Sequence, residues 1–229
     1  MKPYYQNEFA TIYHADSLEN PKLWASGDVM VTDPPYGIRW KSRPGGYSNQ
    51  ARAGHFKAHK IDVVKGDTGL EVRDEALNVW GKRPGIVFGA WKKERPENTW
   101  QRLIWYKKGS KPGPLNAAFM SNDEEIYIIG GGAKDGWKKS SPPLRSVIET
   151  SEDRSWAVRR AGHPTPKPLD LMVKLIERCP DGVIVDPFMG AGATLIAAQS
   201  LSRVSVGIEI EEKYCEIAAK RLEEMSVNV

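Results

Sequence analysis

Two short segments that lie far apart in the chain carry residue types suited to a binding site. The first is the run 33–36, Asp-Pro-Pro-Tyr, which follows the apolar run 29–32. The second is the run 186–194, Asp-Pro-Phe-Met-Gly-Ala-Gly-Ala-Thr, which follows the apolar run 183–185. Short apolar runs of this kind are typical of buried strands. Because ligands of open α/β sheets bind just outside the carboxyl ends of the strands, we expect both segments to face one crevice.

The first segment has the acceptors needed to hold an exocyclic amine. Prolines fix the backbone and remove its N–H donors, so the segment offers the Asp33 carboxylate and the Pro34 carbonyl at a fixed geometry. These two acceptors match the two N–H bonds of an amine. Tyr36 can lie flat on the ring that carries the amine, an interaction worth about 1–3 kcal/mol for a nucleobase. A proline turn that only closes a strand is the alternative interpretation.

The second segment has the glycines of a nucleoside-binding loop. Gly190 and Gly192 depart from the G-x-G-x-x-G spacing of dinucleotide-binding proteins, but they stand between a strand and a helix. Glu209 ends the next strand, about 20 residues further on, where an acid can accept hydrogen bonds from ribose hydroxyls. The sequence has no Gly-Lys-Ser/Thr run to grip phosphates. A nucleoside without phosphates therefore fits better than ATP or NAD, and Asp186 would suit an amino acid's ammonium.

Strands that alternate with helices must position these segments. Apolar runs predict strands at 11–14, 29–32, 85–89, 103–106, 125–129, 183–185 and 204–208, and apolar periodicity predicts helices at 74–82, 169–178, 193–201 and 211–225. This alternation favours a mostly parallel sheet. Four strands end in an acid: Asp16, Asp33, Asp186 and Glu209. A helix N-cap or a turn explains any one of them, but four at one edge favour a crevice for a polar ligand.

The size and composition of the chain fit a single domain that spans residues 1–229. A chain of 229 residues is long enough to bury a real core, and 40% apolar with 27% charged residues is ordinary for a soluble protein. No apolar run approaches the roughly 18 residues that span a bilayer. The N-terminus has no apolar signal core. Cys179 and Cys215 have neither metal-ligand nor disulfide spacing, so we expect a cytoplasmic protein without a metal and with both cysteines in the core.

The set and the order of these segments resemble the amino-type DNA methyltransferases that use S-adenosylmethionine, in the circularly permuted order called the beta group. Run 33–36 resembles their catalytic motif and run 186–194 their cofactor loop. Run 163–168, His-Pro-Thr-Pro-Lys-Pro, is similar to the segment that precedes this loop. Residues 207–221 resemble the strand and helix that follow it, and run 12–16 resembles the start of family members, although Ala15 stands where glycine is usual.

The resemblance implies a Rossmann-like class I methyltransferase fold, with a mostly parallel seven-stranded sheet and helices on both faces. Asp33 and Pro34 would accept hydrogen bonds from the target amine while its nitrogen attacks the sulfonium methyl group in line. Tyr36 would stack on a base that is flipped out of the duplex. The implied catalytic residues are Asp33, Pro34, Pro35 and Tyr36. The implied cofactor-binding residues are Asp16, Thr165, Lys167, Asp186, Phe188, Gly190, Gly192, Thr194 and Glu209, with Thr165 and Lys167 near the cofactor's carboxylate.

The resemblance also implies that two segments rich in lysine and arginine bind double-stranded DNA. Residues 37–62 contain a single acid and would close over the flipped base, and residues 130–162 take the place of the family's target-recognition segment. Because that segment is short, it would read few base pairs, or the enzyme would rely on a partner or a homodimer. The residues expected to contact phosphates are Arg39, Lys41, Arg43, Arg52, Lys138, Lys139, Arg159 and Arg160.

The leading hypothesis is a site-specific methyltransferase that methylates adenine N6 in DNA, of the restriction–modification type. In the family that the chain resembles, aspartate at the first position of the catalytic motif is typical of adenine-N6 enzymes, and serine there is typical of cytosine-N4 enzymes. Cytosine-N4 methylation is the nearest alternative. An RNA substrate, a non-catalytic DNA-binding protein with the same fold and a small-molecule methyltransferase are further alternatives.

Overall fold

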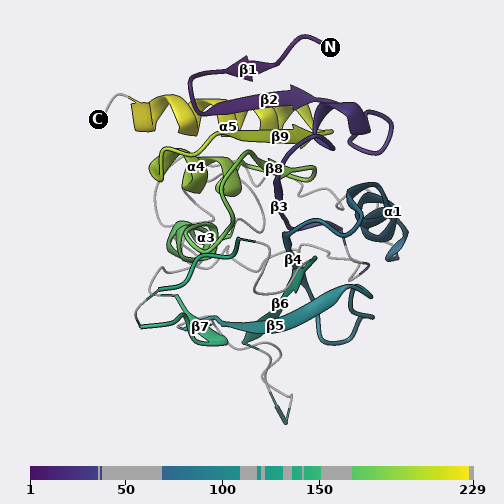
Figure 1. Cartoon of the computed structure of the whole chain (residues 1–229). Coiled ribbons are helices and arrows are strands. Elements are labelled where there is room, and N and C mark those ends of the chain that lie inside the picture. Colours follow the sequence, from purple (N-terminus) through teal and green to yellow (C-terminus); the bar gives the residue numbers. More distant parts are fainter. Residues whose placement is uncertain are drawn as a thin grey trace, which may run out of the picture.

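The central feature of the computed structural model is one mixed β-sheet, built from segments far apart in the sequence (Figure 1). The structure describes residues 1–35, 37, 69–108, 118–119, 122–130, 136–140, 142–150 and 167–226. Within them the strands are β1 (Tyr5–Gln6), β2 (Ala10–His14), β3 (Val29–Thr32), β4 (Gly85–Gly89), β5 (Thr99–Tyr106), β6 (Asp123–Ile129), β7 (Val147–Glu149), β8 (Ile184–Asp186) and β9 (Ser205–Glu209). The helices are the 3-10 helix η1 (Pro21–Leu23), α1 (Glu71–Trp80), α3 (Leu169–Ile176), α4 (Ala193–Ser200) and α5 (Glu212–Ser226).

The sheet differs from the predicted seven-stranded one, because it has nine strands in the part of the chain that the structure describes. Their order is β1-β2-β9-β8-β3-β4-β6-β5-β7. Strands β2, β9, β8, β3 and β4 run parallel, whereas β6 runs antiparallel to both β4 and β5. The two strands that were not predicted, β1 and β7, have two and three residues, which is too short to show an apolar period. Strand β7 also lies inside the segment 130–162, where no strand was predicted.

The strand order brings the two motif segments together. Strand β8 lies between β3 and β9, and the register pairs Met30 with Val185 on one side and Asp186 with Gly207 on the other. Since these three strands and β2 run parallel, their carboxyl ends lie side by side at one edge of the sheet. The residues that follow each strand therefore face a common region.

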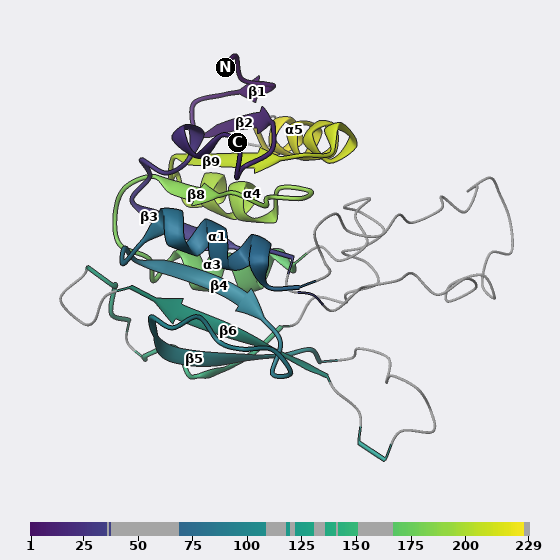
Figure 2. The ribbon, with the colours of Figure 1, turned by 90° about the vertical axis from the view of Figure 1, so that its right-hand side faces the viewer.

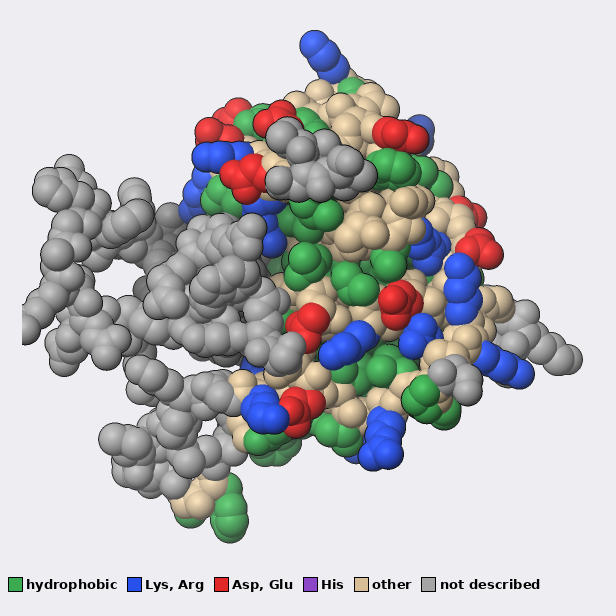
Figure 3. Space-filling view, turned by 90° about the vertical axis from the view of Figure 1, so that its left-hand side faces the viewer, with side chains coloured by type: hydrophobic (Ala, Val, Ile, Leu, Met, Phe, Trp, Pro, Cys, Tyr) green, Lys and Arg blue, Asp and Glu red, His purple; other side chains and the backbone are tan. Residues whose placement is uncertain are grey.

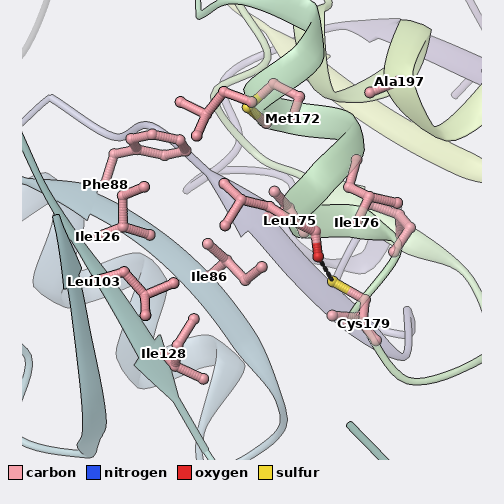
Figure 4. Close-up of a cluster of buried hydrophobic side chains, with 14 of the residues drawn as sticks. Ile86, Phe88, Leu103, Ile126, Ile128, Met172, Leu175, Ile176, Cys179 and Ala197 are labelled. Atoms are coloured by element: carbon pink, nitrogen blue, oxygen red, sulfur yellow. Dashed lines mark hydrogen bonds between the residues drawn. The ribbon is translucent and has the colours of Figure 1, made fainter. Parts of the chain in front are cut away.

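Alternating residues of the strands build two cores, one on each face of the sheet. Val31, Ile86 and Ile126 lie in the core under α3 and α4, and part of this core is drawn in Figure 4. Their strand neighbours Met30 and Val87 pack on the other face with helix α1. Figure 1 shows α3, α4 and α5 on one side of the sheet, and Figure 2 shows the molecule from the side of α1. The prediction of helices on both faces is therefore confirmed.

Helix α5 closes the first face at the β2 end of the sheet. Cys215, Ala218 and Leu222 pack there with Ile12 and Leu195. The two cysteines are buried, as the sequence predicts. Among the described residues, every helix is too short or too polar to cross a bilayer.

We expect Leu175→Ala to lower the free energy of unfolding by about 2–5 kcal/mol, because the change leaves a cavity between α3 and the sheet. Leu175 is fully buried in the cluster of Figure 4. Urea unfolding followed by circular dichroism measures the loss. Val79→Ala, at an exposed position of α1, is the control and should change stability by less than about 0.5 kcal/mol. Equal effects of the two changes would contradict this packing.

Candidate active site

A pocket of about 290 Å³ opens at the carboxyl ends of β2, β3, β8 and β9. Pro35 of the first motif segment and Phe188 of the second both line it, which confirms that the two segments share a crevice. Asp16, Glu209 and Val72 of α1 line it as well. The volume is close to the lower end of the range for small-molecule sites. The remaining lining residues are Ala15, Ser17, Leu18, Pro187, Ile208 and Ile210.

The carboxylate of Asp186 holds this edge of the sheet together. It accepts hydrogen bonds from Thr32 Oγ1 at 2.7 Å, from Thr194 Oγ1 at 2.6 Å and from the Phe188 N–H at 3.1 Å. Asp186 is buried, and burial raises its pKa from 3.8 to about 6. These bonds join β3, the glycine loop and α4. Thr194 and Asp186, both expected to bind the cofactor, thus act on each other inside the protein, and their contact with a cofactor remains a prediction.

The glycine loop needs a glycine at its second position for two reasons. Gly192, which precedes α4, has a left-handed backbone with φ 78°. A Cβ atom there would lie 2.8 Å from the Cβ of Ala218 on α5. The loop can therefore pack closely on α5.

Glu209 links the end of β9 to the glycine loop. Its carboxylate accepts hydrogen bonds from the Gly190 N–H at 3.0 Å and from the Glu211 N–H at 2.8 Å. Burial raises the pKa of Glu209 from 4.5 to about 7, although these hydrogen bonds favour the ionised form. Asp16 lies across the same pocket, and its carboxylate accepts a hydrogen bond from the Leu18 N–H at 2.9 Å. The pocket thus places two acids where hydroxyl groups could bind.

Asp33, at the end of β3, is held by a buried lysine. Lys167 Nζ donates a hydrogen bond to Asp33 Oδ2, and it lies 3.3 Å from Glu124 Oε2. Lys107 forms an ion pair with the other oxygen of Glu124. Asp33 Oδ1 is buried and has no hydrogen-bond partner among the residues that the structure describes. An acceptor left in this state is unusual in a folded protein and calls for an explanation, which a donor on a ligand would supply.

Burial and the neighbouring charges act on this group in opposite directions. Burial raises the pKa of Asp33, and the ammonium of Lys167 partly offsets the effect. For Lys167, burial lowers the pKa, but Asp33 and Glu124 together raise it above its ordinary value. Lys167 therefore stays charged beside the carboxylate. Sequence reasoning missed Glu124 and Lys107. Both flank apolar strands, and their closeness follows only from the antiparallel pairing of β5 with β6.

Some predicted site residues lie outside the described residues. They are Tyr36, Thr165, Arg39, Lys41, Arg43, Arg52, Arg159 and Arg160. Lys138 and Lys139 are described and exposed. Lys138 pairs with Asp181, which precedes β8, so it lies near the edge of the sheet opposite the pocket. The structure therefore does not bring this predicted phosphate contact to the crevice.

Two further observations bear on where a large ligand would approach. A Cβ atom on Gly37 would lie 2.9 Å from the Cα of Gly69, so these two glycines lie side by side. On the face shown in Figure 3, the described Lys and Arg side chains are interspersed with Asp and Glu. Among described residues that face has no large patch of one sign, the feature that attracts a phosphate backbone.

The sequence and the fold are both similar to those of DNA methyltransferases. A family profile described as DNA methylase (N6_N4_Mtase) matches residues 28–220. The type II methyltransferase M.ScaI of Streptomyces caespitosus is 30% identical, over 97% of this chain and 84% of its own length. The type II methyltransferase M2.LlaDCHI of Lactococcus lactis subsp. cremoris is 27% identical, over 96% of this chain and 92% of its own length.

Two solved structures share the fold. The complex of M1.HpyAVI with SAM has a TM-score of 0.64 and 21% identity, and the match covers 93% of this chain and 99% of that one. The cytosine-N4-specific PvuII DNA methyltransferase has a TM-score of 0.64 and 18% identity, over 96% of this chain and 88% of that one. At these identities the structures support the fold alone.

We expect Thr194→Val to destabilise the protein more at about pH 8 than at about pH 4. The folded-state pKa of Asp186, about 6, exceeds its ordinary value of 3.8, so the stability gained from its protonation is lost as pH rises through about 6. Removing the Thr194 donor raises this pKa further and deepens the loss, by about 1–3 kcal/mol at the higher pH. Urea unfolding at both pH values measures the difference. An equal loss at both would contradict the proposed donation to an ionised carboxylate.

Proposed function

Because the chain belongs to the N6/N4 DNA methylase family, whose members methylate DNA with S-adenosylmethionine, we propose that it methylates the exocyclic N6 amine of an adenine flipped out of duplex DNA. One observation carries this proposal. The buried Oδ1 of Asp33 lacks a hydrogen-bond partner among the described residues, and Pro35, two residues further along the chain, lines the pocket. An exocyclic amine supplies the donor that this acceptor lacks.

The residues of the pocket fit the cofactor. S-adenosylmethionine supplies a methyl group that its sulfonium sulfur makes reactive. Glu209 and Asp16 offer carboxylates for the ribose hydroxyls, and Phe188 offers an aromatic wall. Gly192 lets the glycine loop pack closely on α5. We propose these residues and Gly190 as the cofactor-binding set.

Asp33 and Pro34 act on the amine through hydrogen bonds. Asp33 Oδ1 and the Pro34 carbonyl accept its two N–H bonds, which draws the nitrogen lone pair out of conjugation with the ring. The amine's proton becomes acidic only as the new N–C bond forms, so Asp33 need not be a strong base. Asp33 Oδ1, which accepts one of the N–H bonds, is then placed to receive that proton. Positioning and the stabilisation of developing charge supply most of the rate.

The choice of adenine rests on the aspartate of the first motif position. In the family that the chain resembles, aspartate at the position of Asp33 is typical of adenine-N6 enzymes, and serine at this position is typical of cytosine-N4 enzymes. The cytosine-N4-specific PvuII enzyme shares the fold, so cytosine N4 is the second candidate. Both amines present the same two N–H donors to Asp33 and Pro34.

We expect radioactive methyl groups to enter N6-methyladenine when the protein acts on duplex DNA with labelled S-adenosylmethionine. Digestion of the DNA to nucleosides and chromatography identify the labelled base. Asp33→Ala should bind the cofactor as the wild type does, while methyl transfer falls by at least about 100-fold, because one acceptor for the amine is lost.

Asp181→Ala, an exposed aspartate near the opposite edge of the sheet, is the control and should leave transfer unchanged. Label in N4-methylcytosine would show that cytosine, and not adenine, is the target base. Transfer that persists in Asp33→Ala would remove Asp33 from the mechanism.

We expect S-adenosylmethionine to bind more tightly as pH rises through about 7, the pKa to which burial raises Glu209. Ribose hydroxyls donate to the ionised carboxylate, so a protonated Glu209 must lose its proton first, and Kd should rise by about tenfold between about pH 8 and pH 6. Titration calorimetry at several pH values measures this. Glu209→Gln should weaken binding and flatten the pH dependence, whereas Glu212→Gln, exposed on α5, should retain it. A steep dependence in Glu209→Gln would assign the titration to another group.

A further inference from the structure

We propose that Lys167 is a positioning residue for Asp33: it holds the carboxylate by Oδ2 and thereby presents Oδ1 to the target amine. This inference rests on the proposed function and assigns Lys167 a different task from the expected contact with the cofactor's carboxylate. It begins with the division of the Asp33 carboxylate. Oδ2 accepts a hydrogen bond from Lys167, and the buried Oδ1 has no partner among the described residues.

Lys167 is the second member of a row of four alternating charges. Asp33 pairs with Lys167, Lys167 lies 3.3 Å from Glu124, and Glu124 pairs with Lys107. The row runs from the end of β3 to the adjacent ends of β5 and β6. Each inner charge thus has a neighbour of opposite sign on both sides, an arrangement that fixes the position of a buried charge.

The surroundings of Lys167 leave its ammonium little freedom. Its side chain is only 8% exposed. Nζ lies 4.7 Å from the ring centroid of Phe88 and 5.9 Å from that of Trp105, so aromatic faces cover it where carboxylates do not. A buried ammonium that lost one of these partners would be strongly unfavourable. The lysine is therefore a fixed point to which Asp33 can be attached.

Regular structure supports both ends of the row. Lys167 directly precedes Pro168, whose extended backbone (φ −60°, ψ 138°) caps helix α3. The register of β5 and β6 pairs Trp105 with Glu124 and Tyr106 with Asp123, which brings Lys107 next to Glu124. A carboxylate attached by one oxygen cannot turn freely about its last bond. Its second oxygen therefore keeps one direction, as the in-line geometry of methyl transfer requires.

The charges that face Asp33 predict opposite effects for two substitutions. Lys167 and Lys107 favour its ionised form, whereas Glu124 disfavours it, and Asp186 faces it from β8. Acceptance of the amine's hydrogen bond requires the ionised form. Lys167→Met should therefore move the acidic limb of the activity profile to higher pH, and Glu124→Gln should move it to lower pH. Opposite shifts would show that both charges act directly on Asp33, and a loss of kcat without a loss of cofactor affinity would then assign the lysine its positioning role.

The experiment compares the wild type with Lys167→Met, Lys167→Arg, Glu124→Gln and the control Lys174→Met, an exposed lysine of α3 that pairs with Asp170. It measures Kd for S-adenosylmethionine, kcat at saturating cofactor and its pH profile. For Lys167→Met we expect Kd within about threefold of the wild type and kcat lower by about 100-fold, because the reacting groups lose their alignment. Lys167→Arg should restore part of kcat, and Lys174→Met should match the wild type.

A second measurement does not depend on turnover. Carboxyl carbon resonances of labelled aspartate, with Asp33 assigned from Asp33→Asn, report its pKa directly. We expect this pKa to rise in Lys167→Met and to fall in Glu124→Gln. If Lys167→Met does not fold, Glu124→Gln still tests the direction in which the pKa of Asp33 moves. Lys167→Arg still tests whether another cation at this position supports kcat.

Two results would overturn the inference. One is a Kd for S-adenosylmethionine that rises at least about tenfold in Lys167→Met while kcat and the Asp33 titration stay unchanged, which would place the lysine on the cofactor. The other is an Asp33 titration that moves in the same direction in both variants. Failure of the wild type to methylate DNA would instead refute the proposed function, and the titration would then show only whether Lys167 is coupled to Asp33.

Discussion

The three hydrogen bonds accepted by the Asp186 carboxylate are the constraint on which the site depends. They join Thr32 at the end of β3, the Phe188 N–H of the glycine loop and Thr194 in the first turn of α4. Thr32 stands more than 150 residues before the other two groups in the chain. The segment that bears Asp33 and the loop that lines the pocket are therefore fixed relative to each other by one buried carboxylate, whose pKa of about 6 reflects the unfavourable burial of its charge.

The parallel centre of the fold could be predicted because each strand carries its own local signal. The runs 29–32 and 85–89 match β3 and β4 at both ends, and the acids that follow the strands do meet at one edge. An apolar run followed by a distinctive turn is information that lies within a few residues. That is why Asp33, Phe188, Gly192 and Glu209 could be placed at this edge of the sheet from sequence. The resemblance of the motifs and of their order gave the family, which the profile match to residues 28–220 confirms.

The other features of the fold and the site depend on pairing between distant segments, which a pattern within a few residues cannot predict. The row of charges around Lys167 needs the antiparallel turn of β6 between β4 and β5, whereas alternation of strands and helices suggested a mostly parallel sheet of seven strands. The hydroxyl partners of Asp186 come from β3 and α4, so its hydrogen bonds could not be predicted from the segment 186–194 alone. Strand β7 is stabilised by its pairing with β5 rather than by an apolar run of its own.

The close approach of Gly37 and Gly69 bears on how the number of residues between them can vary. Positions 37 and 69 nearly touch, so the fold holds the same short separation between them whatever number of residues stands between them in the sequence. The entropy of bringing two such positions together changes only slowly with that number. A change in chain length between these two glycines therefore costs the sheet little.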